Sequence, residues 1–179
     1  STNTVWGYMI VLKHIVAIAR NDGRLPFNPF SGYINSPESV DRGYLSQEEI
    51  KAVMNYKTAN KAHARIRDLF VFSIFTGLAY ADVKNLTTDN LQTMFDGELW
   101  IITRRKKTNT ESRIRLLDIP KRILERYRNT EFAGTGGKVF KFQTHVNMNW
   151  QLKRIAKAAD IDKRLTFHMS RFTFATTVC

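Results

Sequence analysis

The sequence has one cysteine, no long hydrophobic run and few acidic residues, and each shortage excludes a class of protein. The single cysteine, Cys179, excludes an internal disulfide and a metal cluster held by cysteines. Apolar runs such as IVAIA and LFVFSIF fall far short of the roughly 20 residues that span a bilayer. No signal peptide with a cleavage site opens the chain. We therefore expect a cytoplasmic protein that does not span a membrane.

Two familiar kinds of ligand site are also missing. His14, His63 and His145 lie far apart in the sequence, and none belongs to an HExxH pattern, so we expect no bound metal. The glycine-rich stretch GTGGK has neither the spacing of a phosphate-binding Walker loop nor its Ser or Thr. We interpret this stretch as a flexible loop.

Apolar residues recur at helical spacing over much of the chain, and 43% of the residues are apolar, enough for a buried core. The first pattern predicts an amphipathic helix that closes on Gly23, followed by a linker rich in proline over residues 24–43. Ser46 and Glu49 form a capping-box signature at the start of a second helix. A strongly apolar helix over residues 63–78 is expected at the centre of the core.

The hydrophobic period changes near the middle of the chain. ELWIITR and SRIRLLDIP alternate or are rich in β-branched residues, which predicts an antiparallel hairpin with a basic tip between them. Further helices are expected over PKRILERYRN, THVNMNWQLKRIAKAADI and LTFHMSRFTFATT. The predicted inner stripe of the second of these helices consists of Trp150, Leu152, Ile155, Ala156 and Ala159. The predicted fold is mainly α with a small antiparallel β-hairpin or sheet.

Positive charge is abundant. The chain has 28 Lys and Arg against 16 Asp and Glu, a formal net charge of +12. Such an excess favours a polyanionic partner, because neutralised phosphates release condensed counterions. Nucleic acid is therefore the first candidate partner, and an anionic membrane surface is the second.

Residues 104–128 hold ten basic and three acidic residues. A charge run is often only a solvated surface, but this run falls on the predicted hairpin and the next helix, a geometry that can follow a phosphate backbone. The candidate DNA-binding residues are Arg104, Arg105, Lys106, Arg113, Lys121 and Arg122.

One histidine and one arginine interrupt the apolar C-terminal stretch LTFHMSRFTFATT. His168 and Arg171 are three residues apart, so they share one face of a helix. Burying a guanidinium there is costly unless an anion pairs with it. Arg171 is therefore either bonded to an internal carboxylate, beside a structural histidine, or held ready for a ligand.

Three motifs together resemble the catalytic domain of the tyrosine recombinases, the phage integrase family. They are FSIFTGLAYADVKNL, the hairpin segment RRKKTNTESRIRLLDIP and LTFHMSRFTFATT, in that order. The sequence is most similar to integrases of conjugative transposons, mobile elements of Bacteroides-type bacteria. The resemblance covers residues 44–179 and implies a catalytic domain that is incomplete at its C-terminus. It also implies that residues 1–23 are the last helix of a SAM-like core-binding domain, joined by the linker 24–43.

The resemblance implies site-specific DNA recombination and integration without a cofactor. Members of the family attack a strand of double-stranded DNA with a tyrosine and keep the phosphoester energy in a phosphotyrosyl link, so they need neither metal nor ATP. Arg171 would bind the non-bridging phosphate oxygens, and His168 would hydrogen-bond the phosphate or manage the tyrosine's proton. Lys107, or Lys106 if the register differs by one, would protonate the leaving 5′-oxygen. Asp82 would brace Arg171 or a nearby backbone group.

Two departures from the family pattern change these expectations. Ala79 stands where most members have the arginine of a T-G-x-R motif, so either another arginine, such as Arg104 or Arg105, reaches the same oxygens or the enzyme relies on fewer phosphate contacts. None of the six tyrosines follows Arg171, so we expect the nucleophile downstream and this fragment alone to be inactive. The family also implies a homotetramer on DNA. The alternative hypothesis is a DNA-binding protein without catalysis, such as a degenerate integrase.

Overall fold

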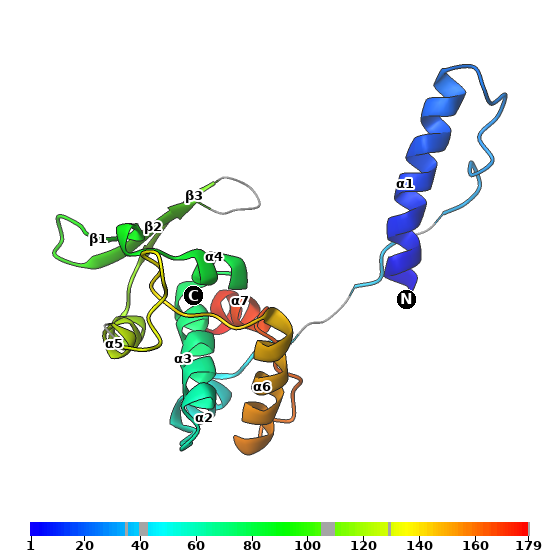
Figure 1. Cartoon of the computed structure of the whole chain (residues 1–179). Coiled ribbons are helices and arrows are strands. Elements are labelled where there is room, and N and C mark those ends of the chain that lie inside the picture. The colour runs from blue at the N-terminus through cyan, green and yellow to red at the C-terminus, as the bar shows by residue number, and fades with distance from the viewer. Residues whose placement is uncertain (35, 40–42, 105–109, 129, 179) are drawn as a thin grey trace. The chain divides into compact units, whose positions relative to one another are not determined.

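The structure is a computed structural model that describes every residue except 35, 40–42, 105–109, 129 and 179 (Figure 1). Its contacts divide the chain into two compact units, Ser1–Asp41 and Arg42–Cys179.

In the first unit, the chain forms a helix and then runs back along it. The helix is α1 (Thr2–Asn21), which the apolar period predicted. Asn3 ties the returning segment to the start of the helix, because its side-chain amide donates to Glu38 O at 3.0 Å and its amide oxygen accepts from Glu38 N at 2.8 Å. Lys13 donates to the carbonyl of Tyr33. The residues that the sequence marks as a linker are thus partly hydrogen-bonded to α1.

The second unit is built around one buried helix. Its first helix, α2 (Gln47–Asn55), begins at the predicted capping box: Ser46 Oγ accepts from Glu49 N at 3.2 Å, and the Glu49 carboxylate accepts from Ser46 N at 2.7 Å. The next, α3 (Lys61–Thr76), is the predicted central helix. It is buried on several sides because it contacts α2, α5, α6 and α7.

A small antiparallel sheet follows α3 and α4 along the chain. Its strands, in spatial order, are β1 (Leu91–Thr93), β2 (Leu99–Arg104) and β3 (Glu111–Arg115). The predicted hairpin is confirmed, because β2 pairs with β3 and places the fully buried Ile101 opposite Ile114. The sequence did not predict β1, because three residues are too few to show an alternating pattern.

The remaining helical elements pack with α3 and the sheet into the second unit (Figure 1). They are α4 (Tyr80–Asn85), the 3-10 turn η1 (Thr88–Asn90), α5 (Asp118–Tyr127), α6 (His145–Ala158), α7 (Met169–Thr173) and the π-helical turn η2 (Phe174–Val178). A mainly helical unit with a small sheet is the fold that the sequence predicted.

The predicted inner stripe of α6 is wrong at one position. Trp150 lies on the outer side, 53% exposed, with the guanidinium of Arg154 4.8 Å from its ring. Met148 is fully buried in the inner stripe together with the predicted Leu152 and Ile155. A large aromatic at helical spacing looked like core, but a neighbouring arginine covers its ring instead.

The loop over residues 132–140 is fixed by hydrogen bonds, contrary to the flexible loop that the sequence suggested. Val139 N donates to Leu86 O at 2.9 Å, and Thr88 N donates to Gly137 O at 2.9 Å. A Cβ at Gly134 would lie 2.6 Å from the carbonyl oxygen of Lys138, so this glycine permits a close approach of the backbone. The loop therefore braces the end of α4.

Candidate active site

Buried hydroxyls hold α7, the helix of Arg171, against the end of α3. Ser73 Oγ on α3 and Ser170 Oγ on α7 lie 2.6 Å apart, and both residues are fully buried. The carbonyl oxygen of Leu78 lies 2.6 Å from Ser73 Oγ. Leaving such a hydroxyl without a partner is costly, so this contact fixes Arg171, the next residue, relative to the loop after α3.

Gly77 lets α7 approach α3 this closely. It ends α3 in the left-handed conformation, at φ 64°, and donates its N–H to Ser73 O at 2.9 Å. A Cβ at this position would lie 2.6 Å from Cδ1 of Phe174, in the turn that follows α7. The glycine of the TGLAY motif is thus required both by the helix end and by the ring packed on it.

A cleft of about 490 Å³ opens beside Arg171. Its walls come from residues 76–78 after α3, from residues 112–114 on β3, and from Arg171 with the start of η2. Each of the three sequence motifs therefore supplies one wall. Arg113 lines the same cleft, so the structure brings two arginines from distant parts of the sequence to one cavity.

Arg171 and His168 are joined by the backbone of α7 but lie in different settings. Arg171 is half-buried, and none of the ion pairs between described residues includes it. His168 is exposed at the N-cap position of α7, and its ring packs edge-on against Phe172, with centroids 5.2 Å apart. It does not line the cleft. The internal carboxylate that the structural alternative requires for Arg171 is not found in the described part of the chain.

The segment after the first wall carries Ala79 and Asp82. Ala79 is the N-cap residue of α4 and directly follows the lining residues 76–78. Asp82 lies in the first turn of α4, where a negative charge suits the helix dipole. Among the ion pairs of the described residues, none joins Asp82 to Arg171. The bracing role of Asp82 stays a prediction.

The candidate DNA-binding arginines of the hairpin region are exposed. Arg104 ends β2, and Arg122 lies on the outside of α5. The Nε of Arg113 donates to the Glu111 carboxylate at 2.7 Å, which leaves the terminal nitrogens for another partner. The predicted general acid and its neighbours, Lys107, Lys106 and Arg105, lie outside the described residues.

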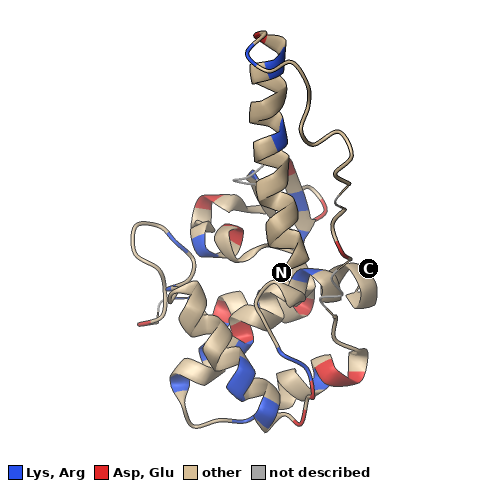
Figure 2. Ribbon diagram, turned by 90° about the vertical axis from the view of Figure 1, so that its right-hand side faces the viewer, with Lys and Arg blue, Asp and Glu red and all other residues tan. Residues whose placement is uncertain are grey.

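Lys121 differs from these arginines because it is already paired. It donates to the carboxylate of Glu98, which also lies 3.2 Å from Arg115. Hydrogen bonds from Lys121 and then Arg115 hold the pKa of Glu98 below its usual range. Positive charge is not limited to this region, since each of the helices α1 to α7 carries at least one lysine or arginine (Figure 2).

The helix of Arg171 is also hydrogen-bonded to the start of the second unit. Leu45 N donates to Thr173 Oγ1 at 3.0 Å, and Thr177 Oγ1 donates to Leu45 O at 2.8 Å. Thr173 in turn donates to Met169 O at 3.0 Å. We call Leu45, Thr173 and Thr177 the Leu45 clamp. It holds both backbone polar groups of one residue between two turns of the Arg171 segment.

A separate polar cluster joins α3 to α5. Asp68, 4% exposed, accepts from Tyr127 Oη at 2.8 Å, from Arg126 at 2.7 Å and from Arg67 at 2.8 Å. Burial, and then the hydrogen bond to Asp68, raises the pKa of Tyr127 far above its usual range. None of these residues lines the cleft, so the cluster is structural.

Two further kinds of site are not found in the described part of the chain. Nowhere in it do three or more His, Cys, Asp or Glu side chains come together as a metal site would require. No described helix combines the length and the apolar character needed to cross a bilayer.

Sequence reasoning missed the contacts that position Arg171. The Ser73–Ser170 pair joins residues 97 positions apart, and the Leu45–Thr173 bond joins residues 128 positions apart. A hydroxyl in an apolar stretch signals that some partner exists, but not which one. The glycine of TGLAY was visible in the sequence, whereas the ring that packs on it was not.

Comparison with known proteins agrees with the three motifs. The family model described as the phage integrase family matches residues 43–179. Among solved structures, the fold is similar to that of the Tn1549 transposon integrase in complex with circular intermediate DNA, with a TM-score of 0.75 and 19% identity. It is also similar to a lambda integrase dimer bound to a COC′ core site (TM-score 0.68, 18% identity) and to the XerH site-specific recombinase bound to its palindromic difH substrate (0.62, 18%).

These matches cover most of this chain but only part of each known structure. They extend over 98%, 92% and 79% of this chain, and over 66%, 60% and 43% of the Tn1549, lambda and XerH chains respectively. No curated protein matches the sequence. At these identities the structures establish the tyrosine recombinase catalytic fold, and the family model covers well over half of the chain. The chain therefore belongs to the phage integrase family.

Proposed function

We propose that this chain is part of a tyrosine recombinase that performs site-specific DNA recombination or integration. The reaction is metal-independent cleavage and rejoining of DNA strands through a phosphotyrosyl intermediate. One observation carries the proposal: the cleft beside Arg171 is lined by all three motifs, and no ion pair between described residues occupies that arginine. A half-buried guanidinium that pairs with no carboxylate of the described residues suits an external phosphate.

In this proposal the scissile phosphate binds in the cleft. Arg171 donates to its non-bridging oxygens and stabilises the charge that grows on them as phosphorus becomes pentacoordinate. The bond from a tyrosine oxygen to phosphorus forms while the bond from phosphorus to the 5′-oxygen breaks. His168 hydrogen-bonds the phosphate or takes the tyrosine's proton, and Lys107 gives a proton to the leaving 5′-oxygen.

The attacking tyrosine is not supplied by these residues. All six tyrosines of the chain are described, and none of them lines the cleft. We propose that the nucleophile comes from outside residues 1–179, so that this chain alone does not cleave DNA.

Arg113 takes the place of the arginine missing at Ala79 in this proposal. It is the second arginine that lines the cleft of Arg171, and its terminal guanidinium nitrogens are not used by the Glu111 pair. Of the two arginines that the sequence suggested for this role, Arg104 is exposed at the end of β2 and does not line the cleft, and Arg105 lies outside the described residues. A phosphate held by two guanidinium groups satisfies the charge requirement that the family meets with its first-motif arginine.

We further propose that the enzyme serves a conjugative transposon of a Bacteroides-type bacterium and acts as a homotetramer on double-stranded DNA in the cytoplasm. The similarity to a transposon integrase structure solved with DNA supports the mobile element and the DNA partner. We assign residues 1–23 to the end of a core-binding domain and residues 24–43 to the linker. The match of that structure to 98% of this chain supports the assignment.

The test uses a full-length protein that contains this chain and a nicked suicide substrate that traps the covalent intermediate. Arg171→Ala is expected to bind the DNA but to form less adduct by a factor of about 10² to 10³, the usual effect of removing one donor to a developing oxyanion. Arg128→Ala is the charge-matched control, because Arg128 is exposed, is the C-cap residue of α5 and does not line the cleft.

Two results would count against the proposal. Adduct from Arg171→Ala at the level of the control would show that the cleft is not the catalytic site. Tight DNA binding by the wild-type protein with no adduct at all would favour the non-catalytic DNA-binding protein instead.

A further inference from the structure

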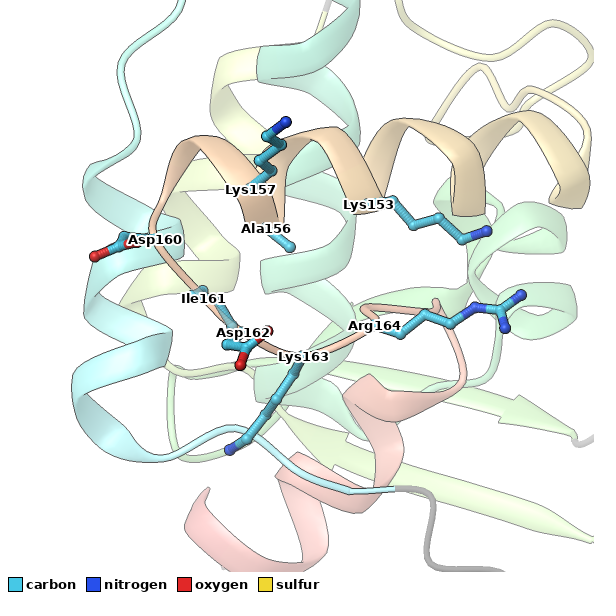
Figure 3. A pocket seen from close by; sticks show the side chains of 8 residues that line it. All are labelled: Lys153, Ala156, Lys157, Asp160, Ile161, Asp162, Lys163 and Arg164. Carbon is cyan, nitrogen blue, oxygen red and sulfur yellow. The ribbon is translucent and has the colours of Figure 1, made fainter.

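A second cavity, of about 410 Å³, lies at the C-terminal end of α6 (Figure 3). It is formed by the last turns of α6 and by residues 160–164, which lead toward α7. It shares no lining residue with the cleft of Arg171. The cavity is therefore a separate feature of the surface, and neither the motifs nor the proposed reaction accounts for it.

The cavity is lined by six charged side chains, of which four are basic. They are Lys153, Lys157, Lys163, Arg164, Asp160 and Asp162. Lys163 is already engaged, because its Nζ pairs with the Glu49 carboxylate at 2.7 Å and donates to Tyr44 O at 2.9 Å.

Lys153 and Arg164 form the pair of interest within this set. Figure 3 shows their side chains extending toward the same side, whereas Lys157 and Asp160 point elsewhere. Neither Lys153 nor Arg164 takes part in an ion pair between described residues. Two positive charges on one side of the cavity, with no counterion among the described residues, form a place where an anion would be attracted by both.

The backbone on both sides of this pair is rigidly held. Phe167 N donates to Asn149 Oδ1 at 2.8 Å, which ties the segment of Arg164 to α6 one turn before Lys153. The fully buried Leu165, next to Arg164, anchors the same segment in the core. Because the two backbones are fixed, little ordering of the chain is needed when a ligand binds between the two cations.

We propose that Lys153 and Arg164 bind a backbone phosphate of duplex DNA other than the scissile one. The inference rests on the proposed function and extends it along the DNA. Arg164 and Arg171 belong to one segment of the chain, and each strand of duplex DNA offers a phosphate about every 3.4 Å along the axis. An arginine fork beside a lysine charge fits a phosphodiester. The pair contributes affinity and register, not base recognition.

The experiment compares two double variants of this chain that lose the same charge. Lys153→Gln with Arg164→Gln removes the proposed contact. Lys157→Gln with Lys51→Gln is the control, because Lys157 lines the same cavity but points elsewhere and Lys51 is exposed on α2. The dissociation constant for a fluorescent duplex is measured by anisotropy at salt concentrations between about 50 and 200 mM, the range over which phosphate contacts dominate the change in affinity.

The proposed pair is expected to account for one phosphate contact. Its removal should reduce the slope of log affinity against log salt by about 0.9, whereas the control should change the slope much less. Lys153→Arg with Arg164→Lys keeps both charges and should restore most of the slope. This variant separates lost contacts from a folding defect.

The possible outcomes distinguish this inference from the proposed function. Suppose that the wild-type chain binds DNA with a steep salt slope, but the two double variants have equal slopes. That result would overturn the phosphate contact and leave the proposed function standing. The phosphate contact would also be overturned if the two double variants bound DNA equally but differed in their dissociation constants for an acidic peptide such as polyglutamate. A wild-type chain whose DNA binding does not depend on salt would instead contradict the proposed function.

Discussion

Replacing Gly77 by alanine tests whether the close approach of α7 to α3 holds the cleft together. The new methyl group meets two separate costs. A non-glycine residue in the left-handed conformation costs about 1–2 kcal/mol, and Gly77 has φ 64°. The Cβ would also lie 2.6 to 3.1 Å from three ring atoms of Phe174. One of them is Cγ, at the base of the ring, so the side chain cannot simply swing its tip aside.

The expected loss of stability follows from these two terms. Overpacking of a close contact costs about 1–3 kcal/mol, so Gly77→Ala should lower the free energy of unfolding by about 2–5 kcal/mol. Gly97→Ala is a matched control, because Gly97 has φ 73° and nothing within 4 Å of a Cβ. It should lose only the conformational term, about 1–2 kcal/mol. Urea unfolding followed by circular dichroism measures both, with the slope m unchanged.

A second substitution isolates the contact with the ring. In a Phe174→Ala background, Gly77→Ala should cost no more than Gly97→Ala does, since the ring that it meets is gone. If Gly77→Ala and Gly97→Ala are equally destabilising in the native background, the close packing of Phe174 on Gly77 is not a real constraint. The reasoning that places Arg171 through this contact would then fail.

Two further predictions concern buried hydroxyl groups. Tyr127→Phe removes a hydrogen bond to the charged Asp68 and should cost about 1.5–3 kcal/mol in urea unfolding at neutral pH. Burial raises the pKa of Tyr127 in the folded state. The contribution of its hydroxyl to the free energy of unfolding should therefore be full below the ordinary tyrosine pKa of about 10 and fall as the pH rises above it. If the free energy of unfolding of Tyr127→Phe fell equally at alkaline pH, this prediction would be contradicted. Thr173→Val leaves the buried Leu45 N–H without its acceptor and should lower the free energy of unfolding by about 1–3 kcal/mol. The Leu45 amide should also exchange its hydrogen faster. Unchanged exchange would show that the Leu45 clamp is not formed.

Local signals in the sequence predicted most of the fold. Ser46 and Glu49 marked a helix start that the structure confirms, and Gly77 marked a helix end. Each works because the physical cause lies within a few residues: a side chain that satisfies an orphan N–H, or a residue that adopts positive φ without strain. The strand β1 escapes prediction because a three-residue strand owes its existence to its neighbour β2 rather than to its own pattern.

The candidate site was only partly predictable. The stretch around His168 and Arg171 stands out because charged residues interrupt an apolar run. Nothing in the sequence indicates that Arg113 shares a cleft with Arg171, because β3 and α7 meet only through the tertiary fold. Helical periodicity predicts that Trp150 is buried, because the pattern depends only on the size and spacing of the apolar residues. It cannot show that Arg154 covers the ring on the solvent side.

The Leu45 clamp has a mechanical consequence. Leu45 lies near the start of the second unit, Arg42–Cys179, and Thr173 and Thr177 are hydrogen-bonded to its N–H and its carbonyl. A pulling force on residues 24–43 would therefore act first on the helical turns α7 and η2, which carry Arg171, Thr173 and Thr177.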